Sequence, residues 1–279
     1  MTFGAMHAGT VAGSRIRRLA ARLIAAGFVA ASLATSAAAQ DRGAARVRAG
    51  PRWPMHSMER PAPLVVTPAP AGPPTTPPSD AIVLFGANGL AEWQTDSAES
   101  APWKVGPGYF EIAPGTGGIR TRAAFGDVQL HIEWMAPPPR GEGQDRGNSG
   151  VFLMGRYEVQ VLDSWQNRTY ADGQAGAIYG QFPPLVNASR PPGEWQAYDI
   201  VFRAPAFAGD TVLRPARLTV FHNGVLVQDD MPLLGPTSHQ RRDPYEPHAA
   251  ELPISLQDHG APVRYRNIWV RKLGPAEGK

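Results

Sequence analysis

A strand with one polar face contains the first residues that could carry chemistry. Between Asn148 and Asp163, residues 157–161 read Y-E-V-Q-V, so that apolar side chains alternate with polar ones. Because successive side chains of a strand point to opposite faces, one face is apolar and the other carries Glu158 and Gln160. A carboxylate beside an amide can donate to and accept from hydroxyl groups, as a sugar-binding site requires. The alternative interpretation is the ordinary solvated face of an outer strand.

Two pairs of residues near the end of the chain are further candidates. Asp258 and His259 lie in an expected turn and could act as a general base or bind a metal ion, although a histidine in a surface turn is more often only solvated. Arg264 and Arg266 are two positions apart and therefore share one face of a strand. Such arginines can serve solubility alone, or they can bind a carboxylate or an enolate oxygen.

Several carboxylates could also form the acid pair of a conventional glycosidase. Glu133 lies in a second alternating stretch, 128–135, on the face opposite the predicted core. Glu133, Glu158 and Asp163 have suitable chemistry, but such a pair needs a separation that only the fold defines. The sequence has no H-E-x-x-H motif, phosphate-binding loop or G-x-S-x-G nucleophile elbow, so serine-hydrolase and nucleotide chemistry have no support.

The distribution of charge argues against a nucleic-acid partner. The 279 residues include no cysteine, so a packed core rather than disulfides must stabilise the fold. The formal net charge is +3, but the residues up to Ser79 carry +7 and the remainder carries −4. The basic residues therefore belong to the N-terminal part, and the rest of the chain has no basic surface typical of phosphate-backbone binding.

Residues 1–39 have the three parts of a secretory signal peptide. Four arginines between positions 15 and 22 precede an apolar run over 23–33, and three alanines at 37–39 form an A-x-A site. An uncleaved membrane anchor would need about 20 apolar residues. We therefore expect cleavage after Ala39, export to the periplasm or the cell exterior, and a mature chain without an integral membrane segment. The Arg17-Arg18 pair leaves the export route open.

The rest of the chain divides into a linker, a domain and a short tail. Residues 40–79 are first rich in arginine and then in proline, which blocks helices and strand pairing and predicts a disordered linker. From 80 to 274, short β-branched and aromatic runs alternate with Gly, Pro, Asn and Asp, and no long helical period occurs. This pattern is typical of an all-β sandwich, with Asn223-Gly224 as its clearest hairpin turn. Residues 275–279 form the tail.

The polar motifs of this domain occur in an order that resembles a known family. The stretches that carry the resemblance are Leu84-Phe85 followed by residues 86–93, Leu130 to Trp134, Asn148-Ser149-Gly150-Val151, residues 157–163, Gly176 to Tyr179, Gly193-Glu194-Trp195, Asn223-Gly224, Leu256 to Gly260, and Arg266-Asn267-Ile268. Over residues 80 to 273 the chain resembles the 3-keto-disaccharide hydrolase family. Met135 and Gln196 depart from residues that are common in that family. The resemblance implies a concanavalin A-like jelly-roll β-sandwich.

The activity implied by the resemblance is cleavage of the glycosidic bond of a 3-keto-disaccharide or 3-keto-glucoside. A ketone at C3 acidifies the proton on C2, so one base can remove that proton while the aglycone leaves from C1. Such a site needs a base, an acid and a group that stabilises the enolate.

We assign hypothetical roles to eight residues on this basis. Glu158 and His259 are the acid/base candidates, and Arg266 would orient the sugar and stabilise the oxyanion together with Asn148 and Gln160. The remaining polar residues of the expected site are Glu133, Asp163 and Gln257. A divalent metal held by some of the carboxylates and His259 could stabilise the enolate equally well, so the metal and cofactor question stays open, as does the oligomeric state.

Two alternatives remain at the level of sequence. A non-catalytic, lectin-like carbohydrate-binding module shares the sandwich fold but does not need a convergent Glu, His and Arg. A conventional endoglycosidase on this fold would carry two carboxylates alternating on one strand. The residue two positions after Glu158 is Gln160, which argues against this second alternative.

Overall fold

A computed structural model describes residues 52–274 of the protein. The predicted signal peptide, the first part of the predicted linker and the predicted tail lie outside the described residues. Within 52–274 the regular structure is almost entirely β-strand, with two short 3-10 helices, η1 (Gly143–Asp145) and η2 (Ala171–Gly173). The predicted all-β class is confirmed. Neither of these helices has the length and apolar character that a membrane crossing requires.

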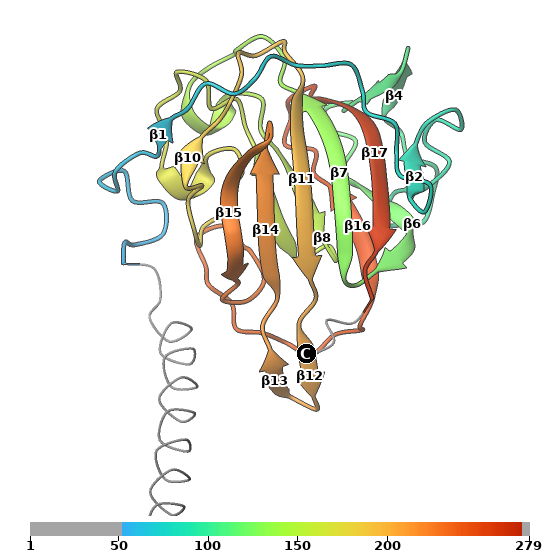
Figure 1. Ribbon diagram of the computed structural model, residues 1–279, viewed down its shortest axis with the longest axis vertical. Coiled ribbons are helices and arrows are strands. Elements are labelled where there is room, and N and C mark those ends of the chain that lie inside the picture. Colours follow the sequence, from blue (N-terminus) through green and yellow to red (C-terminus); the bar gives the residue numbers. More distant parts are fainter. Residues whose placement is uncertain (1–51, 275–279) are drawn as a thin grey trace, which may run out of the picture. The chain divides into compact units, whose positions relative to one another are not determined.

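The larger sheet has eight antiparallel strands, which face the viewer in Figure 1. Its main path is β15 (Val225–Pro232), β14 (Arg217–His222), β11 (Gln196–Arg203), β7 (Val128–Met135), β17 (Arg264–Lys272), β5 (Tyr109–Glu111) and β4 (Lys104–Gly106). The eighth strand, β2 (Ile82–Phe85), pairs with β17 further along that strand than β5 does. Asn223 and Gly224 join β14 to β15 with φ angles of 55° and 80°, as expected for a two-residue hairpin turn.

The smaller sheet has five antiparallel strands and lies behind the larger one in Figure 1. Its spatial order is β3 (Trp93–Gln94), β6 (Ile119–Phe125), β16 (Leu252–Leu256), β8 (Ser149–Leu153) and β9 (Tyr157–Val161). Two short pairs lie outside these sheets: β1 (Leu64–Val65) with β10 (Val186–Asn187), and β12 (Ala206–Ala208) with β13 (Thr211–Arg214).

The core lies between the two sheets. The apolar faces predicted for 128–135 and 157–161 are buried as expected, and they belong to one cluster with Ile200 of β11. Because side chains alternate along each strand, the residues between these apolar positions point to the outer face of their own sheet. The molecule is therefore the predicted jelly-roll β-sandwich, and it has two separate outer faces on which a polar site could lie.

Segment 52–79 is the part of the predicted linker that the structure describes. It forms turns between residues 55 and 59 and is largely extended after them, and it follows the surface of the domain. β1 pairs in parallel with β10, and the Arg190 guanidinium donates to the carbonyl of Ala69 at 3.0 and 2.9 Å. Composition predicted the extended conformation, whereas these contacts depend on residues that are distant in sequence.

Candidate active site

A polar cavity of about 260 Å³ lies on the outer face of the five-stranded sheet. One group of lining residues comes from β8, β9 and the positions that flank β8 and β16, and its members are Asn148, Phe152, Glu158, Gln160 and Gln257. A second group comes from irregular segments, and its members are Tyr179, Thr237, Ser238, His239 and His259. Five of the eight predicted site residues therefore meet in this cavity: Glu158, His259, Asn148, Gln160 and Gln257.

Glu158 is the carboxylic acid that lines the cavity, and its pKa is strongly raised. Its residue is only 5% exposed, and among the described residues it forms no ion pair. Burial penalises the charged carboxylate and raises the pKa of Glu158 to about 8. A carboxyl group with this pKa can hold a proton or accept one near neutral pH, which is the property required of a general acid or base.

Gln160 lies where its amide can hydrogen-bond Glu158 in either protonation state. The end of its amide group lies 2.8 Å from Glu158 Oε1, and one of its two orientations directs the N–H at the carboxylate. Turned by half a rotation, the amide presents its oxygen, which can accept the O–H of protonated Glu158. The amide can therefore hydrogen-bond Glu158 before and after a proton transfer.

Gly150 provides the space that the Glu158 carboxylate occupies. Gly150 lies opposite Gln160 in the register of β8 and β9, and Glu158 lies opposite Phe152. A Cβ atom at position 150 would collide with the Glu158 carboxylate and with the ring of Phe152. The absence of a side chain at this position is thus a requirement of the site.

His259 reaches the cavity because a turn follows β16. Leu256 pairs with Val151 of β8, and the main-chain N–H of Gln257 donates to the Gly150 carbonyl at 3.1 Å. Asp258 does not take part, since its carboxylate accepts the backbone N–H groups of Gly115 and Gly117 at 2.7 and 3.1 Å. Asp258 therefore fixes the turn, and His259 remains exposed at the edge of the cavity.

The sequence did not predict the residues from the segment around position 238. The backbone N–H of Glu158 donates to Thr237 Oγ1 at 3.1 Å, which ties this segment to β9. The Tyr179 hydroxyl lies 3.1 Å from His239 Nδ1. These residues lie in irregular chain without a strand or helix period, so no pattern could indicate their position. Of these residues, Tyr179 alone could have been found from the sequence, because it belongs to the stretch Gly176 to Tyr179 that carries the family resemblance.

A larger cavity of about 520 Å³ borders the loop 136–147 but has less suitable chemistry. Much of its lining is Pro, Ala and Gly. Of its two acids, Glu111 and Asp145, Glu111 is held by Arg264, with Oε2 and Nε 2.7 Å apart. We therefore place the candidate active site in the smaller cavity.

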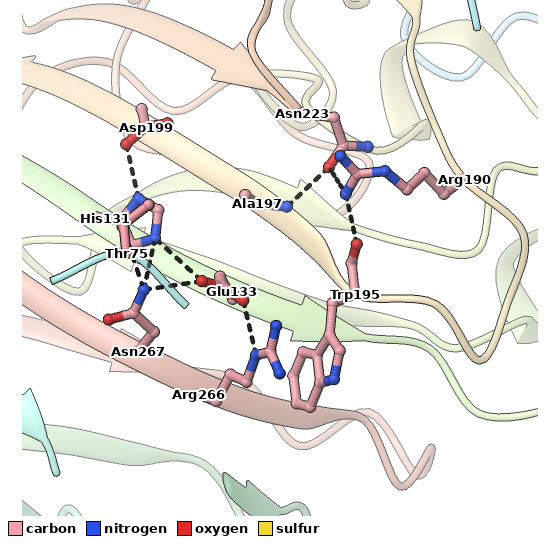
Figure 2. Close-up of polar contacts among 10 residues, drawn as sticks. All are labelled: Thr75, His131, Glu133, Arg190, Trp195, Ala197, Asp199, Asn223, Arg266 and Asn267. Atoms are coloured by element: carbon pink, nitrogen blue, oxygen red, sulfur yellow. Dashed lines mark hydrogen bonds and ion pairs between the residues drawn. The ribbon is translucent and has the colours of Figure 1, made fainter. Parts of the chain in front are cut away.

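Arg266 and Glu133 do not line the candidate active site. They lie opposite each other on β17 and β7, on the outer face of the eight-stranded sheet (Figure 2). Arg266 Nε donates to Glu133 Oε2 at 2.7 Å, and the guanidinium lies 4.1 Å from the centre of the Trp195 ring. The predicted meeting of Glu158, His259 and Arg266 is therefore wrong for Arg266, because β17 belongs to the other sheet. The predicted place of Glu133 beside Glu158 is wrong for the same reason.

The charges around Glu133 compensate one another. Asn267 Nδ2 donates to Glu133 Oε1 at 2.8 Å, and His131 Nδ1 lies 2.7 Å from Asp199 Oδ1 (Figure 2). Burial opposes ionisation of Glu133, but the hydrogen bonds and the positive charges outweigh it and lower the pKa of Glu133. Burial would likewise lower the pKa of His131, but its contacts with Asp199 and Glu133 raise that pKa to about 9. This cluster is a neutralised ion network.

Asp163 also stabilises the fold and lies outside the candidate active site. Its carboxylate accepts Arg146 Nε at 2.9 Å and the backbone N–H of Trp165 at 3.1 Å. Burial raises the pKa of Asp163, while Arg146 partly offsets this effect. Asp163 does not line the cavity, so the structure does not bring it together with the other predicted substrate-binding residues there. Its ion pair instead fixes the second part of the loop 136–147 against the end of β9.

Three side chains that line the cavity, those of Glu158, His239 and His259, are of types that can bind metal ions. Carboxylate oxygen and imidazole nitrogen are common metal ligands. Within residues 52–274, no group of three or more His, Cys, Asp or Glu side chains is arranged to hold a metal ion.

Solved structures include relatives of this chain. A crystal structure of a “putative glycosyl hydrolase” from Parabacteroides distasonis has 44% sequence identity and a TM-score of 0.69, over 77% of this chain and 93% of that chain. A second protein of that organism, described in the same words, has 17% identity and a TM-score of 0.49, over 70% and 94%. A search of curated proteins gives no match.

The family comparison covers the whole sandwich. The 3-keto-alpha-glucoside-1,2-lyase-like domain matches residues 80–271, which include both sheets and all residues that line the candidate active site. The match agrees with the family that the sequence motifs indicate. The chain therefore belongs to the 3-keto-alpha-glucoside-1,2-lyase-like domain family.

Proposed function

We propose that the protein is a carbohydrate-processing enzyme that cleaves the glycosidic bond of 3-keto-glucosides or 3-keto-disaccharides. Membership of the family and the 44% identity to a protein described as a glycosyl hydrolase support this class of activity. The observation that carries the specific proposal is Glu158, a buried carboxyl group with a pKa of about 8 in a polar cavity of about 260 Å³.

Glu158 is the general base of the proposed reaction. The C3 ketone acidifies the C2 proton, and the raised pKa makes the Glu158 carboxylate a stronger base than an ordinary carboxylate. Glu158 takes the C2 proton, the C1=C2 double bond forms, and the bond from C1 to the aglycone oxygen breaks. His259 gives a proton to the leaving oxygen. Water then adds across the double bond, so that the overall reaction is hydrolysis.

Amide and hydroxyl groups of the cavity bind and orient the sugar. Asn148, Gln160 and Gln257 supply amides that can donate to and accept from sugar hydroxyl groups. Because Arg266 lies on the other sheet, enolate stabilisation falls to donors of the cavity itself. The amide of Gln257 and the hydroxyl of Ser238 are the donors that we assign to this role.

We also propose that the enzyme is exported and acts in the periplasm or outside the cell. The arginines before the apolar run 23–33 and the alanines at 37–39 support this proposal. N-terminal sequencing of the protein from the producing cell should give a mature chain that begins at Gln40. Protein found only inside the cell would contradict export, and an intact N-terminus on exported protein would contradict cleavage after Ala39.

The activity is tested with two substrates that differ in one position. Purified protein is incubated with a 3-keto-glucoside and with the same glucoside before oxidation, each with and without a chelator. We expect release of the aglycone from the keto sugar alone. Equal cleavage of both substrates would indicate an ordinary glycosidase. Binding without cleavage of either would indicate the lectin-like alternative.

A further inference from the structure

The segment 52–60 precedes the family domain in sequence but lies beside the candidate active site. The centre of the His56 ring is 4.1 Å from that of Tyr170, 5.1 Å from that of Tyr179 and 5.6 Å from that of His239. Tyr179 and His239 both line the cavity. His56 therefore packs against two side chains that line the cavity.

A buried carboxylate holds His56 in this position. The backbone N–H of His56 donates to Asp172 Oδ2 at 3.1 Å, and His56 Nδ1 lies 3.6 Å from Asp172 Oδ1. Arg60 Nη1 lies 3.7 Å from the same carboxylate, whose side chain is 1% exposed. Burial opposes the charge of Asp172, but its contacts with His56 and Arg60 outweigh burial and lower the pKa of Asp172.

The backbone of His56 adopts a conformation that residues other than glycine rarely take. Its φ is 58°, in the left-handed region. A residue in this region persists where the surrounding contacts determine its conformation, and such residues cluster at ligand sites. The strained backbone and the clamp at Asp172 both direct the imidazole towards the three aromatic rings.

Hydrogen bonds extend this contact into the cavity. The Tyr170 and Tyr179 hydroxyl groups are 3.0 Å apart, and the Tyr179 hydroxyl lies 3.1 Å from His239 Nδ1. His56 thus packs against a connected row of rings, two of which form the cavity wall. Loss of the His56 ring would remove one of the rings that pack against Tyr179 and His239.

We propose that His56 belongs to the substrate site as a positioning residue that holds Tyr179 and His239 against the bound 3-keto-glucoside. The Tyr179 ring offers a flat apolar surface to the C–H groups of a pyranose ring, and its fixed orientation favours binding. This inference rests on the proposed function for its substrate. The enzyme unit would therefore begin upstream of residue 80, where the family match starts.

The kinetic test replaces the ring and retains the backbone conformation. Asparagine tolerates positive φ, so His56→Asn removes the aromatic contact with little added strain. We expect KM for the 3-keto-glucoside to rise about three- to tenfold, with kcat within about twofold of the parent. His56→Phe restores a ring and should recover most of the affinity. Met58→Ala is the matched control, because Met58 is in the same segment and 52% exposed.

Unchanged KM in a folded His56→Asn protein would overturn the inference. A kcat loss without a KM change would also overturn it, because His56 would then act on the chemistry. Thermal melting of each variant shows that the domain remains folded.

A second measurement separates this inference from the proposed function. If the parent cleaves no keto sugar, the proposed function fails. Backbone hydrogen exchange of the ligand-free protein still tests whether His56 holds the cavity wall formed by Tyr179 and His239. We expect His56→Asn, and not Met58→Ala, to increase exchange at residues 177–181 and 237–240. Equal exchange in both variants would overturn the role of His56 whatever the substrate is.

Discussion

The two outer faces of the sandwich carry two glutamates with nearly the same burial and opposite electrostatics. Glu158 is 5% exposed and Glu133 is 6% exposed, and each occupies a polar position of an alternating strand. The pKa of Glu158 is raised to about 8, whereas that of Glu133 is lowered. Burial raises both pKa values, so the difference arises from the neighbours.

The neighbours decide which carboxylate can react. Glu133 has Arg266, Asn267 and His131 within contact distance, and these groups stabilise its charge (Figure 2). Glu158 has the neutral amide of Gln160 and the space left by Gly150. A stabilised carboxylate binds a proton weakly and serves the structure, whereas an unstabilised one binds a proton near neutral pH and can transfer it.

The largest expected effect is on turnover by Glu158→Gln. The substitution keeps the size of the side chain and removes the group that transfers the proton. We expect kcat for the 3-keto-glucoside to fall by about 10²- to 10⁴-fold, the usual contribution of general acid–base catalysis, with unchanged folding. Steady-state kinetics and circular dichroism measure the two properties. Normal activity of this variant would remove Glu158 from the mechanism.

The same carboxylate should make the stability of the parent depend on pH. The folded pKa of Glu158, about 8, lies above its ordinary value of 4.5, so the folded state binds the proton more tightly than the unfolded state. Its contribution is fully present below about pH 4.5 and is lost as the pH rises towards 8. Relative to Glu158→Gln, the parent should lose on the order of 4 kcal/mol of unfolding free energy across this interval.

Urea unfolding of both proteins at several pH values tests this expectation. The interval from about pH 5 to 6 is the most informative, because His131, with an ordinary pKa of 6.5 and a folded pKa of about 9, is protonated there in both states. The contribution of His131 is present below pH 6.5 and is lost as the pH rises through about 9. Parallel curves for the parent and Glu158→Gln would mean that Glu158 titrates normally.

Glu133→Gln should have the opposite profile, with a stability cost and little effect on turnover. The change leaves Arg266 and His131 without their shared anion in a largely buried cluster. We expect a loss of about 2–3 kcal/mol in the free energy of unfolding, measured by urea denaturation. The kcat for the 3-keto-glucoside should stay within about twofold of the parent. Loss of turnover in a folded Glu133→Gln protein would move the reactive centre to the eight-stranded sheet.

The comparison also shows which parts of the site a sequence can predict. Strand alternation correctly predicted that Glu133, Glu158 and Arg266 would point away from the core. A sandwich, however, has two outer faces, and alternation does not tell them apart. The sheet to which a strand belongs depends on long-range pairing, and β17 pairs with β7 while β9 pairs with β8. Arg266 was therefore placed on the correct kind of face but on the wrong sheet.

The irregular segments limited the prediction in a different way. His259 was identified because a polar turn follows an apolar strand, and the pairing of β16 with β8 brings it to Glu158. His239 lies in chain with no period, and His56 lies in a segment whose prolines predicted only an extended conformation. Both are positioned by contacts with residues far away in sequence, which composition does not encode.

The smallest expected effect comes from Gly150→Ala, which probes the space around Glu158 without changing any polar group. The added methyl would collide with the Glu158 carboxylate and the Phe152 ring, so the carboxylate must move from its position beside Gln160. We expect kcat to fall about tenfold, equivalent to about 1.4 kcal/mol of transition-state stabilisation. Gly72→Ala is the matched control, because a Cβ there meets no atom within contact distance. If Gly150→Ala retains full activity, the space beside Gly150 does not position the base. Reactivity on this face would then depend on burial of Glu158 alone.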